Sequence, residues 1–361
     1  FFNISMERES IMDHNIILMP YFNILSLYTL HIILCTIPII WTSKFSSSIP
    51  QTITNDQRTR HNIVAMDNYT KPSNPLLINY HDALIYESDL SLLDNPSAWL
   101  NSDCIHFRLT RLSVMQKLLK NRDAGREDSN SDLFLDPSVV SFLMHQCDEE
   151  DEDDMSDLRR AWELPQPTDV KNESAIQSKP NEIQKKRLFV PINDQYASSR
   201  KSFVNPGGGS HWSFLFWDIS ICQSSGTESN MVTSKFFHFD SSNGYNSRAA
   251  KTTSKKLQKV LVSSWGNAIG ISSDDINLVE CKTPQQTNGC DCGLFALGVA
   301  EALAFADKSS ETPDASELEF IVHYYFDKIG DVKSFGTNLR KIIGDDIRSL
   351  IISECERTCN Y

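Results

Sequence analysis

The sequence has too little positive charge to suggest a nucleic-acid-binding protein. It contains 34 Lys and Arg residues against 47 Asp and Glu residues, a formal net charge of −13, and its basic residues form no dense cluster. A surface with this balance of charge repels a phosphate backbone. We therefore expect no nucleic acid among the partners of this protein.

The cysteines are few and irregularly spaced, which argues against a disulfide framework. Nine cysteines, an odd number, are scattered over 361 residues. This pattern is typical of free thiols in a reducing compartment, so the expected location is the cytoplasm, the nucleus or both. The N-X-S/T motifs at Asn68 and Asn172 are accordingly interpreted as chance matches.

Long apolar runs are also rare, and the only one that approaches a membrane span lies near the N-terminus. Residues 16–41 carry no formal charge, but the charges before them are net acidic, unlike those of a secretory signal. We interpret residues 1–79 as an N-terminal extension in which this segment is either an anchor, with the rest of the chain in the cytosol, or leader sequence. In the second case Met66 is a plausible start. Contact with a membrane is expected only if the anchor is real.

Residues 80–361 are expected to form one folded domain of the α+β class. Aromatic and β-branched residues predict strands at Arg187–Asn193, His211–Ser220, Ser234–Asp240 and Ile276–Cys281. Apolar residues three and four apart predict a helix that Asn101 or Ser102 caps, a short helix that starts at Asp136–Pro137, and helices at Ser247–Val262, Gly293–Ala306 and Leu339–Ile352.

An acidic run interrupts this domain. Residues Cys147–Asp157 read CDEEDEDDMSD, and the polar composition continues to Lys186. Repulsion between like charges favours solvated chain over packed structure. We therefore expect a disordered insert at about residues 147–186.

The stretch QQTNGCDCG, Gln285 to Gly293, places two cysteines beside an apolar segment. A zinc site needs three or four ligands and usually wider spacing, and a thioredoxin-like pair has two residues between its cysteines, whereas one residue separates Cys290 from Cys292. Cys292 opens the segment that is predicted to be a helix. The positive end of a helix dipole favours a thiolate, so Cys292 is the candidate nucleophile.

A nucleophilic thiol needs an imidazole beside it, because a thiol of pKa about 8.5 is only a few per cent ionised at neutral pH. His211 lies at the start of one predicted strand, and Asp240 ends the next. Each residue alone is more often a turn or capping residue. Together with Cys292 they predict a catalytic triad in which Asp240 orients the imidazole.

These residues resemble the Ulp/sentrin family of cysteine proteases. The likeness rests on His-Trp at 211–212, the aspartate of FFHFDSS, and QQTNGCDCG. The pieces SDLSLLDNPSAWLN, FLDPSVVSFL, VPINDQ and GGGSHWSFLFW are similar to the deneddylase branch, which is specific for the Nedd ubiquitin-like modifier. The resemblance covers about Leu84 to Leu350. It implies a papain-like, adenain-type fold with a central mixed sheet flanked by helices, a monomeric enzyme, and neither cofactor nor metal.

The resemblance also implies roles. Cys292 would attack the carbonyl that follows a Gly-Gly terminus, His211 would act as base and then acid, and Asp240 would orient it. Gln286 and the backbone N–H of Cys292 would stabilise the oxyanion. The modifier tail would lie between two indoles and contact the residues around them: Trp99, Trp212, Asn101, Ser102, Asp103 and Gly293. The sequence departs from the family at Ser102, where an acidic residue is usual, and Asp103 follows one position later.

Other functions stay open at this point. A SUMO-specific protease of the same family would share the mechanism. A module that binds a ubiquitin-like protein without cleaving it would lack a member of the triad, and an acyltransferase of related fold would typically have glutamate in place of Asp240. Cys290 stands where an aromatic residue is common. We interpret it as a passenger beside the nucleophile Cys292, with pairing of the two cysteines under oxidation as the alternative hypothesis. The loop Gln195–Ser210 is expected to be mobile until substrate binds.

Overall fold

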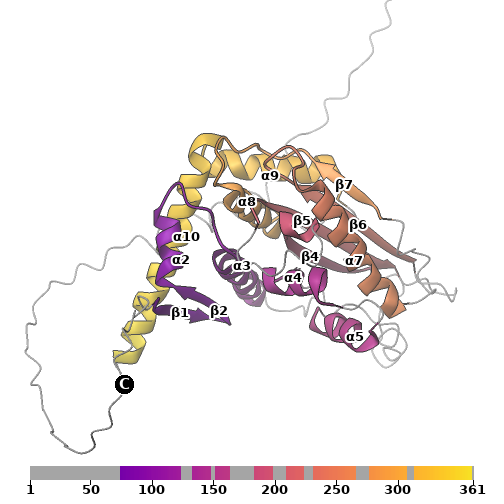
Figure 1. Ribbon diagram of the computed structural model, residues 1–361, viewed down its shortest axis with the longest axis horizontal. Coiled ribbons are helices and arrows are strands. Elements are labelled where there is room, and N and C mark those ends of the chain that lie inside the picture. The colour runs from indigo at the N-terminus through magenta and orange to yellow at the C-terminus, as the bar shows by residue number, and fades with distance from the viewer. Residues whose placement is uncertain are drawn as a thin grey trace, which may run out of the picture. The chain divides into compact units, whose positions relative to one another are not determined.

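A five-stranded mixed sheet forms the centre of the fold and positions the site described below (Figure 1). The strand order is β3 (Asp132–Phe134), β4 (Ile183–Asn193), β5 (Trp212–Cys222), β6 (Met231–Phe239) and β7 (Leu278–Cys281). Strands β4, β5 and β6 are antiparallel, while β3 and β7 run parallel to their neighbours. The predicted α+β class and the mixed sheet are confirmed. All four predicted strands are present within a few residues of the expected bounds.

The computed structural model describes residues 74–122, 132–147, 151–162, 183–197, 209–222, 231–265, 276–306 and 313–359. The residues from Pro75 onward form one unit, so its first strand begins a few residues before the expected boundary at residue 80. The apolar segment 16–41, Met66, both N-X-S/T motifs and most of the loop Gln195–Ser210 lie outside the described residues. Within the described part, no helix is long and apolar enough to cross a membrane.

Helices cover both faces of the sheet. One face packs against α3 (Ser102–Arg122), α8 (Cys292–Ala304), α9 (Ala315–Ile329) and α10 (Val332–Cys359), and the other against α4 (Pro137–His145), α5 (Glu152–Ala161) and α7 (Ser247–Trp265). Side chains of β5 alternate between the two cores, with Phe214 and Phe216 in the first and Leu215 and Trp217 in the second. The apolar run in β5 therefore reflects a strand that is buried on both faces, as predicted.

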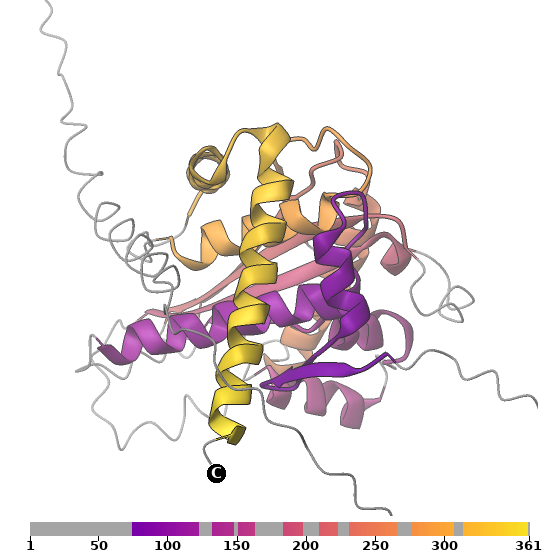
Figure 2. The same ribbon diagram turned by 90° about the vertical axis from the view of Figure 1, so that its left-hand side faces the viewer.

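A hairpin and a short helix precede this core. Strands β1 (Leu76–Tyr80) and β2 (Ala83–Tyr86) pair antiparallel, and α2 (Glu87–Asp94) follows directly. Figure 2 shows α2 lying alongside α10. A helix near the start of the unit therefore packs against the last helix. The segment from α2 to α3, residues 95–101, passes close to the start of α8.

The predicted helix starts are confirmed by their caps. The Asn101 side-chain oxygen accepts a hydrogen bond from the Cys104 N–H at 3.0 Å, at the start of α3. The Asp136 carboxylate accepts one from the Ser138 N–H at 2.7 Å, and Pro137 occupies the first position of α4. Both arrangements satisfy N–H groups that a helix leaves without backbone partners.

The expectation of a disordered acidic insert is wrong for its first part. Residues Glu152–Ala161 form α5, which Asp151 caps, and Met155 and Leu158 are buried against the second core together with Trp162. Three apolar side chains on one face of the helix outweigh repulsion among carboxylates that remain in solvent. Residues 183–186 belong to β4, and residues 163–182 lie outside the described part of the chain.

Buried ion pairs fix α8 against its neighbours. Arg108 of α3 pairs with Glu301 of α8, which is fully buried, and with Asp346 of α10 at 3.2 Å. The hydroxyl of Tyr325 in α9 donates a hydrogen bond to the same glutamate. Four helices thus share one polar cluster inside an apolar core, which determines how far along its axis α8 lies.

Candidate active site

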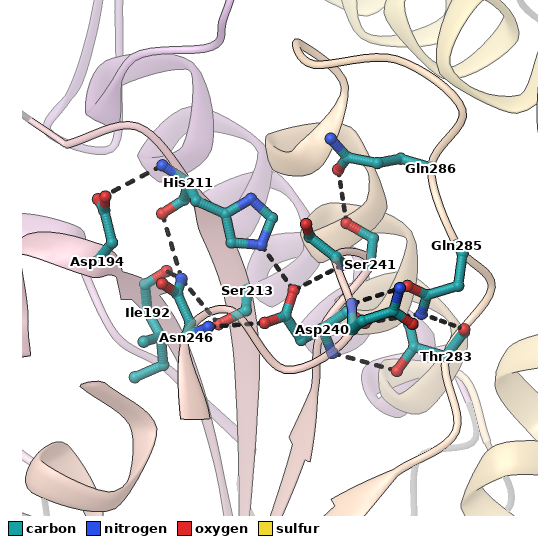
Figure 3. A network of polar contacts seen from close by, with 12 residues as sticks. Ile192, Asp194, His211, Ser213, Asp240, Ser241, Asn246, Thr283, Gln285 and Gln286 are labelled. Carbon is teal, nitrogen blue, oxygen red and sulfur yellow. Dashed lines mark hydrogen bonds and ion pairs between the residues drawn. The ribbon is translucent and has the colours of Figure 1, made fainter. Parts of the chain in front are cut away.

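Strand pairing brings His211 and Asp240 together. His211 immediately precedes β5 and Asp240 immediately follows β6, so the antiparallel register places both residues at the same edge of the sheet. The His211 Nε2 atom lies 2.6 Å from Asp240 Oδ1, and both residues are buried. Figure 3 shows the imidazole ring pointing at this carboxylate. His211, the predicted base and acid, is therefore in contact with Asp240, the residue predicted to orient it.

The Asp240 carboxylate is held ionised and in one orientation. It accepts hydrogen bonds from the backbone N–H groups of Ser242 at 2.9 Å and Asn246 at 2.8 Å, in addition to its contact with His211. Burial alone would raise the pKa of Asp240, but the bonds from His211 and from the two N–H groups lower it below its ordinary value. A carboxylate with three partners has little freedom to rotate, so it fixes the ring that it faces.

His211 is correspondingly disposed to carry a proton. Burial disfavours the charged ring, but hydrogen bonds to Asp240 and Cys292 and the negative charge of these groups raise the pKa of His211 to about 9. Because Nε2 faces Asp240, Nδ1 is the nitrogen left for the thiol. A protonated imidazole between a carboxylate and a sulfur atom is the arrangement that favours an ion pair with a thiolate.

The structure separates the roles of the two cysteines. Cys292 is the first residue of α8, is 1% exposed and has His211 as a hydrogen-bond partner. The Cys290 sulfur lies instead 3.5 Å from the backbone oxygen of Pro96, and partial burial and the charge of Asp291 raise the pKa of Cys290. Only Cys292 therefore combines an imidazole partner with a helix N-terminus. Among the described residues, no three His, Cys, Asp or Glu side chains are grouped to hold a metal.

Gln286 lies near His211 and Asp240, on the loop before α8 (Figure 3). Its backbone N–H donates to the Ser241 oxygen at 3.0 Å, and its side-chain oxygen accepts from the Ser241 hydroxyl at 2.7 Å (Figure 3). Its Nε2 atom donates to the backbone oxygen of Asn288 at 2.6 Å. An amide nitrogen carries two hydrogens, so this bond leaves the second for an oxyanion. Ser241 therefore determines which way the amide faces.

Leu100 connects Trp99 and Trp212: it follows Trp99 in the chain and bonds to Trp212. The Trp212 indole N–H donates to the backbone oxygen of Leu100 at 3.1 Å, so the segment that carries Trp99 is held close to the residue that follows His211. A Cβ atom added to Gly293 would lie 3.2 Å from Leu100 Cβ and 3.5 Å from Trp212 Cδ1. The absence of a side chain at Gly293 thus lets the segment around Leu100 approach the start of α8. Trp99 is 45% exposed, unlike a core tryptophan.

The other residues that were predicted to contact the tail, Asn101, Ser102 and Asp103, differ in whether their side chains are bonded within the protein or exposed to solvent. The Asn101 side chain is committed within the protein, because Nδ2 donates to Asp89 Oδ1 at 2.7 Å while its oxygen caps α3. Ser102 and Asp103 are exposed in the first turn of α3. Partial burial and the neighbouring Asp89 raise the pKa of Asp103. Asn101 is therefore occupied in positioning this segment, while the other two residues face solvent.

Sequence reasoning missed the groups that hold the histidine backbone. Asp194 accepts hydrogen bonds from the N–H of Ser210 at 2.8 Å and the N–H of His211 at 3.4 Å. From the other side, Asn246 Nδ2 lies 3.2 Å from the His211 backbone oxygen and 3.1 Å from Ser213 Oγ (Figure 3). The ring of His211 is therefore held by its backbone as well as by Asp240.

A second histidine supports this arrangement from within. His238 is fully buried, with Nδ1 2.6 Å from Glu280 Oε2 and Nε2 2.9 Å from Ser213 Oγ. Ser213 in turn meets Asn246, so a chain of polar contacts runs from Glu280 to His211 and Asp240. His238 on β6 pairs with Leu215 on β5, and Ser213 lies two residues before Leu215. Because side chains two residues apart on a strand point the same way, Ser213 and His238 lie on one face of the sheet. That periodicity was the available signal for this network.

Comparisons with known proteins agree with the geometry. Residues 98–330 match the model of the Ulp1 protease family, C-terminal catalytic domain. The chain is 32% identical over 235 residues to the probable sentrin-specific protease 8 of Dictyostelium discoideum, covering 64% of this chain and 76% of that protein. It is 28% identical over 268 residues to sentrin-specific protease 8 of Homo sapiens, covering 74% and 99% of the two chains.

A plant protein and a solved structure are also similar to this chain. The chain is 26% identical over 245 residues to NEDD8-specific protease 1 of Arabidopsis thaliana, covering 68% of this chain and 82% of that one. The crystal structure of a de-sumoylating protease aligns with a TM-score of 0.44 at 17% identity, over 76% of this chain and 90% of its own.

Proposed function

The chain belongs to the Ulp1 protease family, and from that premise we propose that it is a cysteine protease that cleaves after the C-terminal Gly-Gly of a Nedd-type ubiquitin-like modifier. The reaction releases either a precursor extension or the lysine side chain of a conjugated target. The observation that carries this proposal is the position of His211 between Asp240 and Cys292, at the N-terminus of α8.

The proposed reaction proceeds in two steps. The Cys292 thiolate attacks the carbonyl carbon of the last glycine, and a C–S bond forms while negative charge develops on the carbonyl oxygen. Gln286 Nε2 and the backbone N–H of Cys292 are the proposed donors to that oxygen, and such a donor contributes roughly 3 kcal/mol in other hydrolases. The C–N bond then breaks as His211 gives its proton to the departing amine.

Hydrolysis of the thioester completes the cycle. His211, now neutral, removes a proton from water, which attacks the same carbonyl carbon. The C–S bond breaks, the modifier leaves with a free carboxylate, and the thiolate and imidazolium are regenerated. Asp240 acts through His211 in both steps, because its carboxylate stabilises the imidazolium and keeps Nε2 turned away from the substrate.

The proposed selectivity for glycine follows from the segment around Leu100. Gly293 allows this segment close to α8, and the Trp212 ring lies within contact of the same place. A tail that runs between Trp99 and Trp212 past this point has room for backbone but not for side chains. Ser102 and Asp103, exposed at the start of α3, are the proposed polar contacts at the entrance.

The preference for a Nedd-type modifier rests on relatives. Sentrin-specific protease 8 and NEDD8-specific protease 1 are the named proteins that this chain resembles over most of its length. The de-sumoylating protease among the solved structures is less similar in sequence. We propose that the enzyme acts as a monomer in the cytoplasm, the nucleus or both, with its catalytic unit in the cytosol if residues 16–41 anchor it.

The experiment that tests this function compares three fluorogenic substrates, in which the Nedd-type modifier, SUMO or ubiquitin carries a dye on its C-terminal glycine. We expect a value of kcat/KM at least about 100-fold higher for the Nedd-type substrate, a difference of about 3 kcal/mol. A higher value for SUMO would retain the mechanism and change the substrate. Binding of a modifier without cleavage would indicate a binding module. Transfer of an acyl group onward to an added acceptor protein, with no hydrolysis of any of the three substrates, would indicate an acyltransferase.

A further inference from the structure

The residue before the nucleophile does not cap its helix in the usual way. An aspartate at the N-cap normally accepts hydrogen bonds through its carboxylate from N–H groups of the first turn. Asp291 occupies the N-cap of α8, but its side chain makes no such bond. Its backbone oxygen accepts from Leu294 and Phe295 instead, at 2.9 and 3.0 Å. The N–H groups of Cys292 and Gly293 are thereby left free of the carboxylate.

The Asp291 carboxylate is turned away from α8 by an arginine of another helix. Arg340 of α10, which is 3% exposed, donates to Asp291 Oδ1 from Nη2 at 3.0 Å and from Nε at 3.3 Å. Asn288 Nδ2 donates to the other carboxylate oxygen at 2.8 Å. Asp291 is also buried, so its charge is balanced inside the protein and not by solvent.

The same arginine reaches the segment that carries Trp99. Arg340 Nη1 donates to the backbone oxygen of Leu92 at 3.0 Å, and Nη2 donates to the backbone oxygen of Ala98. Ala98 is the residue directly before Trp99. One buried guanidinium therefore connects the start of the nucleophile's helix with the segment proposed to hold the substrate tail. A lysine has a single nitrogen and does not reach all three partners at once.

The Asp291 carboxylate packs directly against the backbone of α10 at Gly336. A Cβ atom added to Gly336 would lie 2.0 Å from Asp291 Oδ2 and 2.5 Å from its Cγ. Gly336 and Arg340 are four residues apart and so lie on one face of the helix, one turn from each other. The glycine provides the space and the arginine provides the charge. Both residues lie beyond residues 98–330, the part that matches the family model.

We propose that Arg340 is a positioning residue for both halves of the active site. By holding the Asp291 carboxylate away from the first turn of α8, it leaves the positive end of that helix to stabilise the thiolate and the oxyanion. By holding Ala98, it sets the position of Trp99 relative to Cys292. This inference rests on the proposed role of Cys292 as the nucleophile.

The test uses the full-length chain with Arg340→Lys and Arg340→Gln, and Arg348→Gln as the matched control. Arg348 lies on the same helix and also pairs with an acidic residue, Asp94 at the end of α2, but it is exposed. Four quantities are measured: kcat and KM on the fluorogenic modifier, the iodoacetamide reaction rate at Cys292 mapped by mass spectrometry, and the thermal midpoint.

For Arg340→Gln we expect kcat and the alkylation rate to fall roughly 3- to 30-fold, the size of a charge effect at a helix end, and KM to rise severalfold. Arg340→Lys is expected to keep the alkylation rate closer to wild type, because the charge remains, but to share the rise in KM. Arg348→Gln is expected to stay within about twofold in all three kinetic values.

A second variant separates positioning from folding, because Arg340→Gln leaves a buried carboxylate unpaired. In Asp291→Asn/Arg340→Gln that charge is gone, so the thermal midpoint and the alkylation rate should recover while KM stays high. The inference is overturned if folded Arg340 variants keep wild-type kcat, KM and alkylation rate, or if every loss follows the thermal midpoint. If the wild type cleaves no modifier and alkylation still depends on Arg340, the proposed function fails and the positioning role stands.

Discussion

Nε2 of His211 and Oδ1 of Asp240 lie 2.6 Å apart although 29 residues separate them in sequence. The contact follows from the pairing of β5 with β6, since one residue precedes the first strand and the other follows the second. If one of the two strands shifted its register by one residue, the side chains of that strand would turn to the opposite face of the sheet, and His211 and Asp240 would no longer meet. The proposed chemistry therefore depends directly on how these two strands pair.

The raised pKa of His211 predicts how stability depends on pH. His211 titrates at about 9 in the folded protein against 6.5 for the free side chain. Its protonated form therefore adds stability that is fully present below pH 6.5 and is lost as the pH rises through 9. We expect the wild type to lose about 3 kcal/mol of unfolding free energy relative to His211→Gln between about pH 6 and pH 10.

Urea unfolding of both proteins across this range measures the difference. NMR titration of the His211 ring provides an independent reading, and Asp240→Asn should move that titration to lower pH because a charged acceptor is removed. Parallel stability curves, together with a ring that titrates at its ordinary pKa, would contradict the pairing described here.

Two glycines of α10 should respond oppositely to the same substitution. In Gly336→Ala the new methyl group meets Asp291 Oδ2 at 2.0 Å, so we expect a loss of about 1–3 kcal/mol of stability and reduced activity. In Gly344→Ala the nearest atom is Arg348 Nη1 at 3.1 Å, the end of a flexible side chain. Alanine is the better helix former, so this variant should gain up to about 1 kcal/mol. Chemical denaturation measures both, and equal effects would refute a special role for Gly336.

Trp99 should affect substrate binding far more than stability. The side chain is 45% exposed, so Trp99→Ala is expected to change the free energy of unfolding by less than about 1 kcal/mol. If its indole covers the modifier tail, KM for the fluorogenic modifier should rise at least about tenfold. Phe320→Ala is a suitable control, because Phe320 is 63% exposed on α9, which carries none of the proposed site residues. A similar KM for both variants would exclude Trp99 from the tail site.

Cys290 is predicted to protect the nucleophile from irreversible oxidation. Peroxide inactivation of the wild type should be partly reversed by a thiol, because a sulfenic acid on Cys292 condenses with a nearby thiol to form a disulfide and release water. Cys290→Ser should recover less activity after the same exposure. Residual activity after peroxide and then dithiothreitol gives the comparison, and identical recovery in both proteins would rule out the pairing.

The sequence was sufficient for strands β4 to β7, though not for β3, and for the residues brought together at the edge of the sheet. Apolar strands, the helix after Cys292 and the caps at Asn101 and Asp136 each have a local pattern, and the structure contains all of them. The acidic run was misread because its charge hid the apolar face of Met155, Leu158 and Trp162. Helix α9 and the β1–β2 hairpin were not anticipated at all.

The contacts of Arg340 could not be predicted from local sequence patterns. Nothing near Arg340 in the sequence indicates that it meets Asp291, 49 residues away, and Leu92, 248 residues away. Gly336, one turn before Arg340, lies outside the helix that was predicted at Leu339–Ile352, so its close approach to Asp291 was not anticipated either. Contacts of this kind depend on how α10 packs, which only the tertiary structure determines.

The most direct test of the account uses a Nedd-type modifier with an electrophile in place of its C-terminal carboxylate. The full-length protein and its Cys292→Ala and Cys290→Ser variants are incubated with this probe, and the adduct is mapped by mass spectrometry. We predict labelling of the wild type and of Cys290→Ser at Cys292, and none of Cys292→Ala. Labelling at Cys290, or undiminished labelling of folded Cys292→Ala, would contradict the assignment of the nucleophile on which the account depends.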